Sequence, residues 1–293
     1  MNPPASSPRN AGTTLALSII LAIYASVRIA EAVPNHFPQV AVVGVDVISA
    51  LAFAVIHGAL HYRLRGILVF ACICIMVGNI SENLSVATGF PFGHYYFKEL
   101  MGPKLFHVPL LLGLAYIGMA YVSWTLARLI VGKPEMPVAG TRVVTLPLAA
   151  SFIMVAWDLA QDPVWGTVLH AWAWLDGGPW FGVPISNYLG WYGAVFTIYL
   201  LFAFYLRLRP APAVPERQAS WHAALLFYAF CAAGNVLQAL HPAVPEVVTD
   251  PAGTQWRVAD ITSASALISI FVMGAFAVIA WIRLAEDEKS ATD

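Results

Sequence analysis

The chain has 293 residues, of which 59% are hydrophobic and only 11% are charged, and its mean hydropathy is +0.72. These values lie far from those of soluble domains, so the composition predicts a polytopic membrane protein. The net charge of −1 provides no positive field for nucleic acid, and we expect none as a partner. No low-complexity linker divides the chain. We therefore expect a single membrane domain over residues 1–293, with flexible tails at 1–12 and 285–293.

Apolar runs close to the roughly 20 residues that cross about 30 Å of hydrocarbon recur along the chain. They predict an all-α transmembrane helical bundle of about eight spans, with seven as the alternative. The runs cover residues 13–30, 40–60, 66–88, 106–131, 143–162, 185–206, 221–240 and 261–284. The first run is long for a signal peptide and no small-residue cleavage site follows it, so we interpret it as a span.

Lysine and arginine orient the predicted bundle. With eight spans, eleven of the 15 basic residues fall on one side, and the other side holds only Arg28, Lys98, Lys104 and Arg257. The positive-inside rule then places both termini in the cytoplasm, so Asn10 and Thr292 should be cytoplasmic. The loops that contain Gly93 and Gly178 should face outward.

The third run carries polar side chains close to its end. Asn79, Glu82 and Ser85 follow one another at spacings of three residues, so they can share one face of a helix. A carboxyl near hydrocarbon costs several kcal/mol unless it is paired or protonated, which makes Glu82 a candidate functional residue. The alternative is an interfacial residue without a role.

The fifth run ends in WDLAQDPVW, where Asp158 and Asp162 are four residues apart and stack on one helix face. Two like charges this close disfavour each other's ionisation, so we expect one of the two carboxyls to carry a proton at neutral pH. Pro163 is expected to stop the helix. The alternative interpretation is a polar helix end at the membrane interface.

Two of the outward loops are rich in aromatic residues. The loop GFPFGHYYF supplies the side chains of Phe90, Phe92, Tyr95 and Tyr96. In the loop WAWLDGGPWFGVP, glycine and proline turns would fix the side chains of Trp172, Trp174, Trp180 and Phe181. Such loops can line an apolar pocket for a flat hydrophobic ligand, or they can form an aromatic belt at the membrane interface.

Other polar residues in the spans give weaker signals. His57 and His61 form an HxxxH pair, which in a membrane enzyme suggests a di-iron oxygenase. The remaining histidines are scattered singly, so we expect no metal site. Asp46, Asn235 and Gln238 lie within apolar runs, where they can line a cavity or form hydrogen bonds between helices.

Several classes of membrane protein are disfavoured. Membrane prenyltransferases need two aspartate-rich motifs to hold magnesium and diphosphate, whereas Asp158 and Asp162 form a single, sparser one. A retinal-binding protein needs a lysine in a late span, and the last two runs contain none. No inverted repeat with paired broken helices is evident, which lowers the expectation of a transporter.

Three motifs between the third and sixth runs resemble those of the integral-membrane carotenoid hydratases, the family of the gamma-carotene 1'-hydratase and bisanhydrobacterioruberin hydratase type. The first motif is ExxxxxxGFPFGxY from Glu82, followed by GPxxxxVP from Gly102. The second is WDxxxDP from Trp157, and the third is WxxxGxWFGVPxxNxxGW from Trp174. Members of the family are not all assigned to one reaction, so the resemblance implies a carotenoid substrate more firmly than a single activity.

The resemblance implies a multi-pass enzyme of the plasma (inner) membrane. Its reaction would be the acid-catalysed addition of water to the terminal double bond of an acyclic carotenoid end, which gives a tertiary alcohol without any cofactor. The substrate would be an acyclic or monocyclic carotenoid, with membrane lipid and other carotenoid biosynthesis enzymes as further partners. The alternatives are another end-group enzyme, such as an isomerase or cyclase, and a non-catalytic carotenoid- or lipid-binding protein.

The same resemblance suggests roles for individual residues. Either Asp158 or Glu82 would donate the proton, and Asp162 would help to position or deprotonate water. The aromatic residues would stabilise the carbocation. The expected substrate-binding residues are Asn79, Phe90, Phe92, Tyr95, Tyr96, Trp157, Trp174, Trp180, Phe181, Asn187 and Trp191.

The activity is expected to survive chelation, because protonation of a double bond by a carboxyl group needs neither a metal nor an electron carrier. Detergent-purified protein should form the same amount of product with and without chelator, in the absence of nicotinamide and flavin. Loss of turnover that iron restores would instead favour an oxygenase built on His57 and His61.

Overall fold

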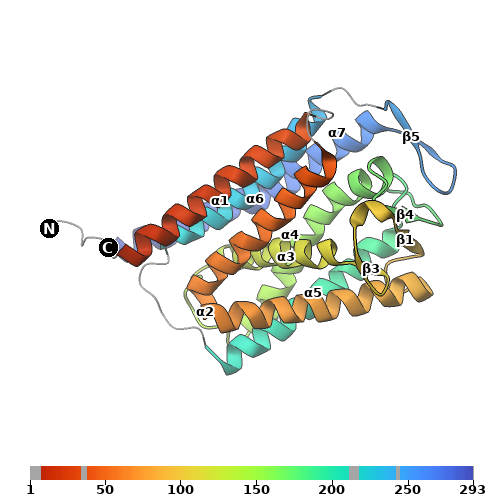
Figure 1. Cartoon of the computed structure of the whole chain (residues 1–293). Helices are drawn as coiled ribbons and strands as arrows, with labels where there is room; N and C mark the ends of the chain where they lie inside the picture. Colours follow the sequence, from red (N-terminus) through yellow and green to blue (C-terminus); the bar gives the residue numbers. More distant parts are fainter. Residues whose placement is uncertain (1–7, 34–37, 211–217, 242–244, 293) are drawn as a thin grey trace.

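The computed structural model describes residues 8–33, 38–210, 218–241 and 245–292. They form a bundle of long helices with three small two-stranded sheets at one end (Figure 1). The helices are α1 (Pro8–Ala32), α2 (Gln39–Thr88), α3 (Leu110–Ile130), α4 (Arg142–Asp162), α5 (Ile185–Leu208), α6 (Gln218–Ala239), α7 (Val258–Ile268) and α8 (Gly274–Thr292). Short helical turns are η1 (Glu99–Met101), η2 (Pro163–Val168) and η3 (Ser269–Met273). The strands are β1 (Tyr95–Phe97), β2 (Lys104–Leu105), β3 (Val108–Pro109), β4 (Trp172–Trp174), β5 (Val247–Thr249) and β6 (Gln255–Arg257).

Within the described part of the chain, seven helices are long and apolar enough to cross a membrane, so the prediction of an all-α polytopic bundle is confirmed. The second of them, Ala41–Thr88, has 48 residues, about twice what one crossing requires. It changes direction at Arg63, which has a non-helical φ of 59° and ψ of 164°. Figure 1 shows the two arms of α2 diverging from this bend. The arms correspond to the second and third apolar runs, so seven helices accommodate the eight predicted runs.

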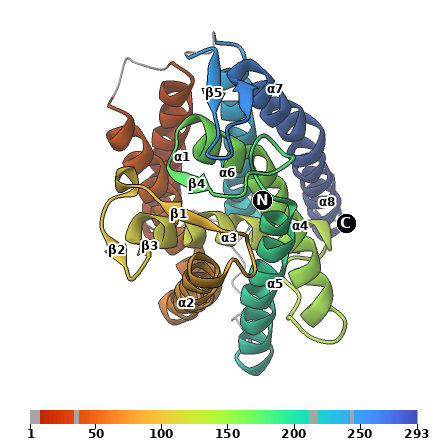
Figure 2. The same ribbon diagram turned by 90° about the vertical axis from the view of Figure 1, so that its right-hand side faces the viewer.

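Helix α3 runs through the middle of the bundle (Figure 2) and packs against α2, α4, α6 and α8. All its residues from Tyr116 to Leu129 are buried. A helix that is apolar on every side is expected in such a central position. Its Trp124 ring contacts Tyr199 and Phe202 of α5, with ring centroids 5.9 and 5.4 Å apart. This packing fixes α3, which in turn fixes Tyr116 in the interior.

The ends of several elements differ from expectation. The prediction that Pro163 stops the helix is wrong, because the chain continues through the π-helical turn η2 to Val168. Proline takes the first position of this turn, where its missing N–H is tolerated. α8 continues to Thr292, so residues 285–292 are helical, and α1 already begins at Pro8. Residues 1–7 and 293 lie outside the described residues.

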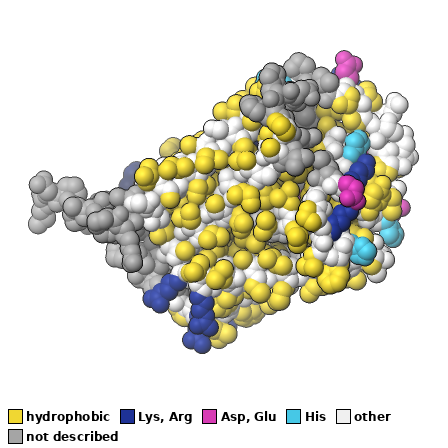
Figure 3. All heavy atoms as spheres, in the orientation of Figure 1, with side chains coloured by type: hydrophobic (Ala, Val, Ile, Leu, Met, Phe, Trp, Pro, Cys, Tyr) yellow, Lys and Arg dark blue, Asp and Glu magenta, His cyan; other side chains and the backbone are white. Residues whose placement is uncertain are grey.

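The surface has the apolar character expected of a membrane-spanning bundle. Large apolar side chains such as Leu15, Ile80 and Leu189 are 62%, 67% and 70% exposed along the helices. Figure 3 shows a broad hydrophobic face, with lysine and arginine side chains gathered near one end and acidic, basic and histidine side chains near the other. The start of α1 and the end of α8 lie at the same end of the bundle, away from the strands (Figure 1), as an even number of crossings requires.

The charge bias predicts that the strand-bearing end faces outward. Gly178 is unsuitable for cysteine labelling there, because a Cβ at this position would overlap the backbone of Val183. Asp176, with a side chain 72% exposed, is the better position. In intact cells, a membrane-impermeant thiol reagent should label Asp176→Cys, whereas Arg209→Cys, at the end of α5, should react only after the cells are opened. The reverse pattern would show that the bundle is inserted the other way round.

Candidate active site

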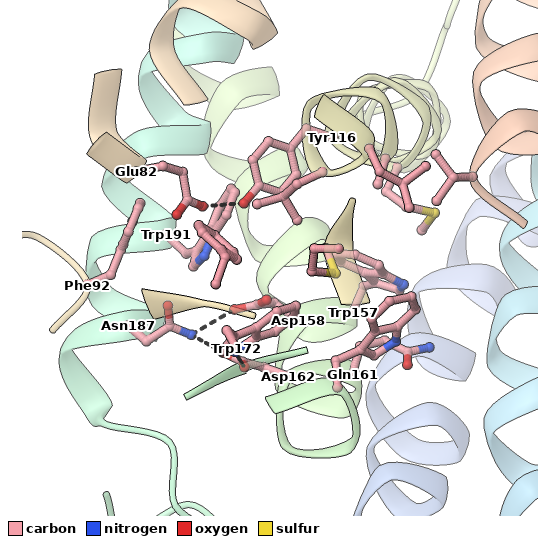
Figure 4. A pocket seen from close by; sticks show the side chains of 18 of the residues that line it. Glu82, Phe92, Tyr116, Trp157, Asp158, Gln161, Asp162, Trp172, Asn187 and Trp191 are labelled. Carbon is pink, nitrogen blue, oxygen red and sulfur yellow. Dashed lines mark hydrogen bonds between the residues drawn. The ribbon is translucent and has the colours of Figure 1, made fainter. Parts of the chain in front are cut away.

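A cavity lies at the strand-bearing end of the bundle, lined by residues from both arms of α2 and from α3, α4 and α5 (Figure 4). It contains about 840 Å³ of empty space, including its open mouth. Strands β1 and β4 pair in antiparallel register, with Tyr95 opposite Trp174, and together they form one wall. We call this pair of strands the β1–β4 lid. The polar lining is Asp46, Glu82, Tyr95, Tyr116, Asp158, Gln161, Asp162 and Asn187.

Glu82 is buried at the cavity, with only 2% of its surface exposed. The hydroxyl of Tyr116 on α3 donates a hydrogen bond to Oε1 of Glu82, as Figure 4 shows. The hydroxyl of Tyr95 on β1 donates a hydrogen bond to Oε2 of Glu82. Gly89 ends α2 in the left-handed conformation, at φ 77°. The chain then folds back, so that the Tyr95 side chain reaches Glu82. The carboxyl is therefore removed from solvent but hydrogen-bonded on both oxygens.

Tyr95 lies outside the membrane-spanning helices. Burial, together with the neighbouring Glu82 carboxylate, raises the pKa of the Tyr95 phenol well above its usual range. The phenol therefore keeps its proton at every physiological pH and acts as a hydrogen-bond donor. Tyr95 and Tyr116 are therefore two hydroxyl donors that fix the position of the Glu82 carboxyl group.

Asp162, the last residue of α4, is 2% exposed and accepts hydrogen bonds from two other parts of the chain. The indole N–H of Trp172 lies 2.9 Å from Oδ1, and that of Trp174 lies 3.4 Å from the same oxygen. The amide of Asn187, on α5, donates to Oδ2. These three N–H groups surround the carboxylate and fasten β4 and α5 to the end of α4.

Asp158 lies one turn before Asp162 on the same face of α4 and lines the cavity. Asn187 also contacts it, with Nδ2 3.4 Å from Oδ2 of Asp158, so one amide lies between the two carboxyls (Figure 4). Asp158 thus receives one long hydrogen bond where Asp162 receives three. Of the two neighbouring carboxyls, Asp158 is the one with the weaker support for a negative charge.

Aromatic rings form most of the remaining wall. Trp191 stacks on Phe92 at a centroid distance of 5.3 Å and meets Tyr116 edge-on at 4.6 Å. Tyr95 contacts Trp174 across the β1–β4 lid, with centroids 4.6 Å apart. Ring faces of this kind stabilise a positive charge on a ligand, and the rings exclude bulk water.

The cavity brings the three predicted acids together with six of the predicted binding residues, namely Phe92, Tyr95, Trp157, Trp174, Asn187 and Trp191. Asn79, Phe90 and Tyr96 do not line it. Tyr96 is 47% exposed because successive residues of strand β1 point to opposite faces, and Phe90 is 69% exposed beyond the end of α2. Asn79 instead accepts hydrogen bonds from the side chain of Asn83.

Trp180 and Phe181 also lie away from the cavity. The Trp180 indole donates to the backbone oxygen of Leu159, at 3.1 Å. Phe181 packs on Trp256 of β6, with ring centroids 5.5 Å apart, in a second apolar cluster. These residues support the loop that leads into α5 and do not contact the cavity.

Thirteen lining residues were absent from the predicted set, and four of them are Tyr116, Gln161, Trp165 and Trp172. Two of them carried a sequence signal, because Trp157, Gln161 and Trp165 follow one another at intervals of four and continue the face that bears the acids. For Tyr116 the sequence indicated only that a phenol in an apolar span needs a hydrogen-bond partner inside the bundle. Trp172 was noted only as part of its loop.

His57 and His61 lie far from these acids, near the bend of α2, and neither lines the cavity. Both ring nitrogens of His57 are used, 2.6 Å from the hydroxyl of Tyr121 and 2.8 Å from the backbone oxygen of Ser220. Nε2 of His61 lies 2.8 Å from the Ser220 hydroxyl. The pair therefore connects α2 to α3 and α6 through hydrogen bonds.

Comparisons with known proteins find sequences that are similar to this chain. A family model described as "Carotenoid biosynthesis protein" matches residues 38–252, which include the whole cavity. Bisanhydrobacterioruberin hydratase from Haloarcula japonica is 31% identical over 124 residues, which cover 42% of this chain. The match spans 40% of that relative's own length. No solved structure matches the chain.

The hydrogen bonds to Asp162 predict a measurable loss of stability in Asp162→Asn. An amide cannot accept all three N–H groups, and a hydrogen bond to a charged group contributes about 1.5–3 kcal/mol. The melting temperature in detergent should fall, together with a change in tryptophan fluorescence as the lid loosens. Asp260→Asn, at a side chain 56% exposed, is the matched control and should melt like the wild type. Equal melting temperatures for the two variants would show that Asp162 does not hold the lid.

Proposed function

Because the chain belongs to the carotenoid biosynthesis protein family, we propose that it is an enzyme that adds water to the terminal double bond of an acyclic carotenoid end group. The observation that carries this proposal is the gathering of three carboxyl groups around one aromatic-walled cavity. Hydration of such an end begins with protonation, which creates a tertiary carbocation, and finishes with capture by water. The reaction therefore needs an acid, a site that stabilises a cation and a held water molecule.

We assign the proton to Asp158. When two carboxyl groups lie this close, one proton is shared between them. It resides on the group whose ionised form receives the weaker hydrogen bonds. Asp162 receives three N–H donors, whereas Asp158 receives a single bond of 3.4 Å. Asp158 also faces the cavity, where it can reach a bound double bond. Transfer of its proton to the terminal double bond places the positive charge on the adjacent tertiary carbon.

Glu82 then stabilises this charge as a fixed anion. The hydroxyls of Tyr95 and Tyr116 hold its carboxylate in place, so little reorganisation is needed when the cation forms. Aromatic faces such as that of Trp191 add about 0.5–2 kcal/mol each where water is excluded. The sequence left Asp158 and Glu82 as equal candidates for the donor, and their hydrogen bonds support this division of roles.

Asp162 acts in this scheme as a positioning residue. The sequence suggested that it guides or deprotonates water, but its oxygens already accept hydrogen bonds from Trp172, Trp174 and Asn187. It orients Asn187, which in turn contacts Asp158. Its negative charge also favours retention of the proton on Asp158.

The surroundings of the cavity agree with a long apolar substrate. A multi-pass membrane protein meets carotenoids in the bilayer, and we place this one in the plasma (inner) membrane with the cavity toward its outer face. The substrate class is an acyclic or monocyclic carotenoid, and the scheme requires no cofactor. Membrane lipid surrounds the bundle, and enzymes that supply or consume the carotenoid are the expected partners.

Expression in a lycopene-accumulating host tests the reaction. We expect a product heavier than lycopene by one or two molecules of water. An isomer of unchanged mass would instead support an isomerase or cyclase, and unchanged lycopene would support a carotenoid-binding protein.

Matched variants test the roles of the acids. General acid catalysis contributes about 10²–10⁴-fold, so Asp158→Asn should lower the hydration rate by at least about 100-fold. Glu82→Gln keeps the shape but removes the fixed charge, and we expect a loss of about tenfold. The exposed residues Glu99→Gln and Asp260→Asn are the controls and should stay within about twofold of the wild type. A larger loss for Glu82→Gln than for Asp158→Asn, at matched protein levels, would reverse the two roles.

A further inference from the structure

The cavity has a second polar region, away from the three acids. Asp46, on the first arm of α2, and Gln161, on α4, both line it. Figure 4 shows Gln161 beside Trp157, on the side away from Glu82. The scheme described so far uses neither residue. Both contact a buried charge network centred on Arg28 of α1.

Arg28 is only 4% exposed although it lies within a membrane-spanning helix. Its Nη1 forms an ion pair with Glu31 and lies 3.8 Å from Oδ1 of Asp46. Its Nη2 donates to Oδ1 of Asn235 on α6 at 2.6 Å, and Gln161 donates to the same oxygen at 2.8 Å. α6 carries Gly234 at this crossing, where a Cβ would overlap the guanidinium.

Arg28 places a positive charge beside Asp46. Burying a guanidinium among apolar helices costs several kcal/mol, so such a group is retained where its charge is used. Glu31 supplies one counter-charge and Asp46 a second, and the permanent charge of Arg28 favours the ionised form of Asp46. Glu31 lies just beyond the apolar run at residues 13–30, but its side chain is only 10% exposed and belongs to this network.

Two atoms of the network suggest a bound water. Oδ1 of Asp46 and Nε of Arg28 are both buried, and neither has a hydrogen-bond partner among the described residues. The 3.8 Å from Oδ1 to Nη1 is an ion-pair distance, too long for a hydrogen bond. Buried polar atoms at the edge of a polar cavity are the usual partners of an ordered water molecule.

We infer that Asp46 and Gln161 hold the water molecule that captures the carbocation, with Asp46 as the base that accepts its proton. This inference rests on the proposed function. Asp158 gives its proton to one carbon of the double bond, and the water oxygen forms a bond to the other. The released proton moves to Asp46 and returns to Asp158 through water in the cavity, so that each turnover consumes one water and no net proton. Acid and base thus act from different parts of the cavity.

Deuterium separates the two steps of this scheme. When the purified protein is incubated with lycopene in D₂O, Asp158 delivers deuterium, and a cation that water fails to capture loses a proton and returns to an alkene. Asp46→Asn should therefore lower the hydration rate by about 100-fold. Deuterium should nevertheless enter the recovered alkene at least as fast as in the wild type. Asp158→Asn should abolish both processes.

Gln161→Met tests the same inference without disturbing the ion pair. Asn235 keeps its hydrogen bond from Arg28 in this variant, so the network should persist even if Asp46→Asn accumulates poorly. We expect hydration to fall about tenfold with deuterium entry unchanged. Glu99→Gln, at an exposed site, should change neither rate.

Three results would overturn the role of Asp46 and Gln161: hydration and deuterium entry that fall together in Asp46→Asn, a fall of both in Gln161→Met, or unchanged hydration in both variants. A parallel fall would mean that the Arg28 network supports the site only structurally. Failure of the proposed function looks different, because the wild-type protein would then form no hydrated product from lycopene, whether or not deuterium enters.

Discussion

The hydrogen bonds around the Asp162 carboxylate join three separate segments of this protein. The residue ends α4, its indole partners Trp172 and Trp174 belong to β4, and Asn187 belongs to the first turn of α5. A carboxylate at this depth must be surrounded by donors, so the three segments cannot move apart without exposing an unpaired charge. The wall of the cavity and the surroundings of Asp158 both depend on this contact.

Most of the fold could be predicted from the sequence because lipid permits few solutions. A backbone in hydrocarbon must satisfy its own hydrogen bonds, so apolar runs of sufficient length become helices. The sequence did not predict that the bend of α2 would occupy a single residue, Arg63. HYRLRG predicts a loop between two spans, whereas the two helical arms meet at a single non-helical residue, Arg63. The prediction that the helix ends at Pro163 was wrong for a related reason, because a π-helical turn accommodates the proline.

The site was harder to predict than the helices. Spacing along α4 brought Asp158 and Asp162 to one face, and this follows from helical geometry alone. The aromatic loops gave no such rule, because the side that each ring faces depends on how strands pair. β1 pairs with β4 across more than 70 residues of chain, and this register turns Tyr95 into the cavity and Tyr96 out of it. Sequence periodicity does not contain that information.

The positions of the hydrogen-bond partners along the chain bear on how the protein is made. A membrane protein is inserted as it is synthesised, and a carboxyl that enters lipid before its partners would be costly. Glu82 meets Tyr95 only 13 residues later, and Asp162 meets Trp172 and Trp174 after 10 and 12 residues. Arg28 has Glu31 within one helical turn. Each of these three groups can thus be paired by the next short stretch of chain to leave the ribosome, before the later helices close the bundle around it.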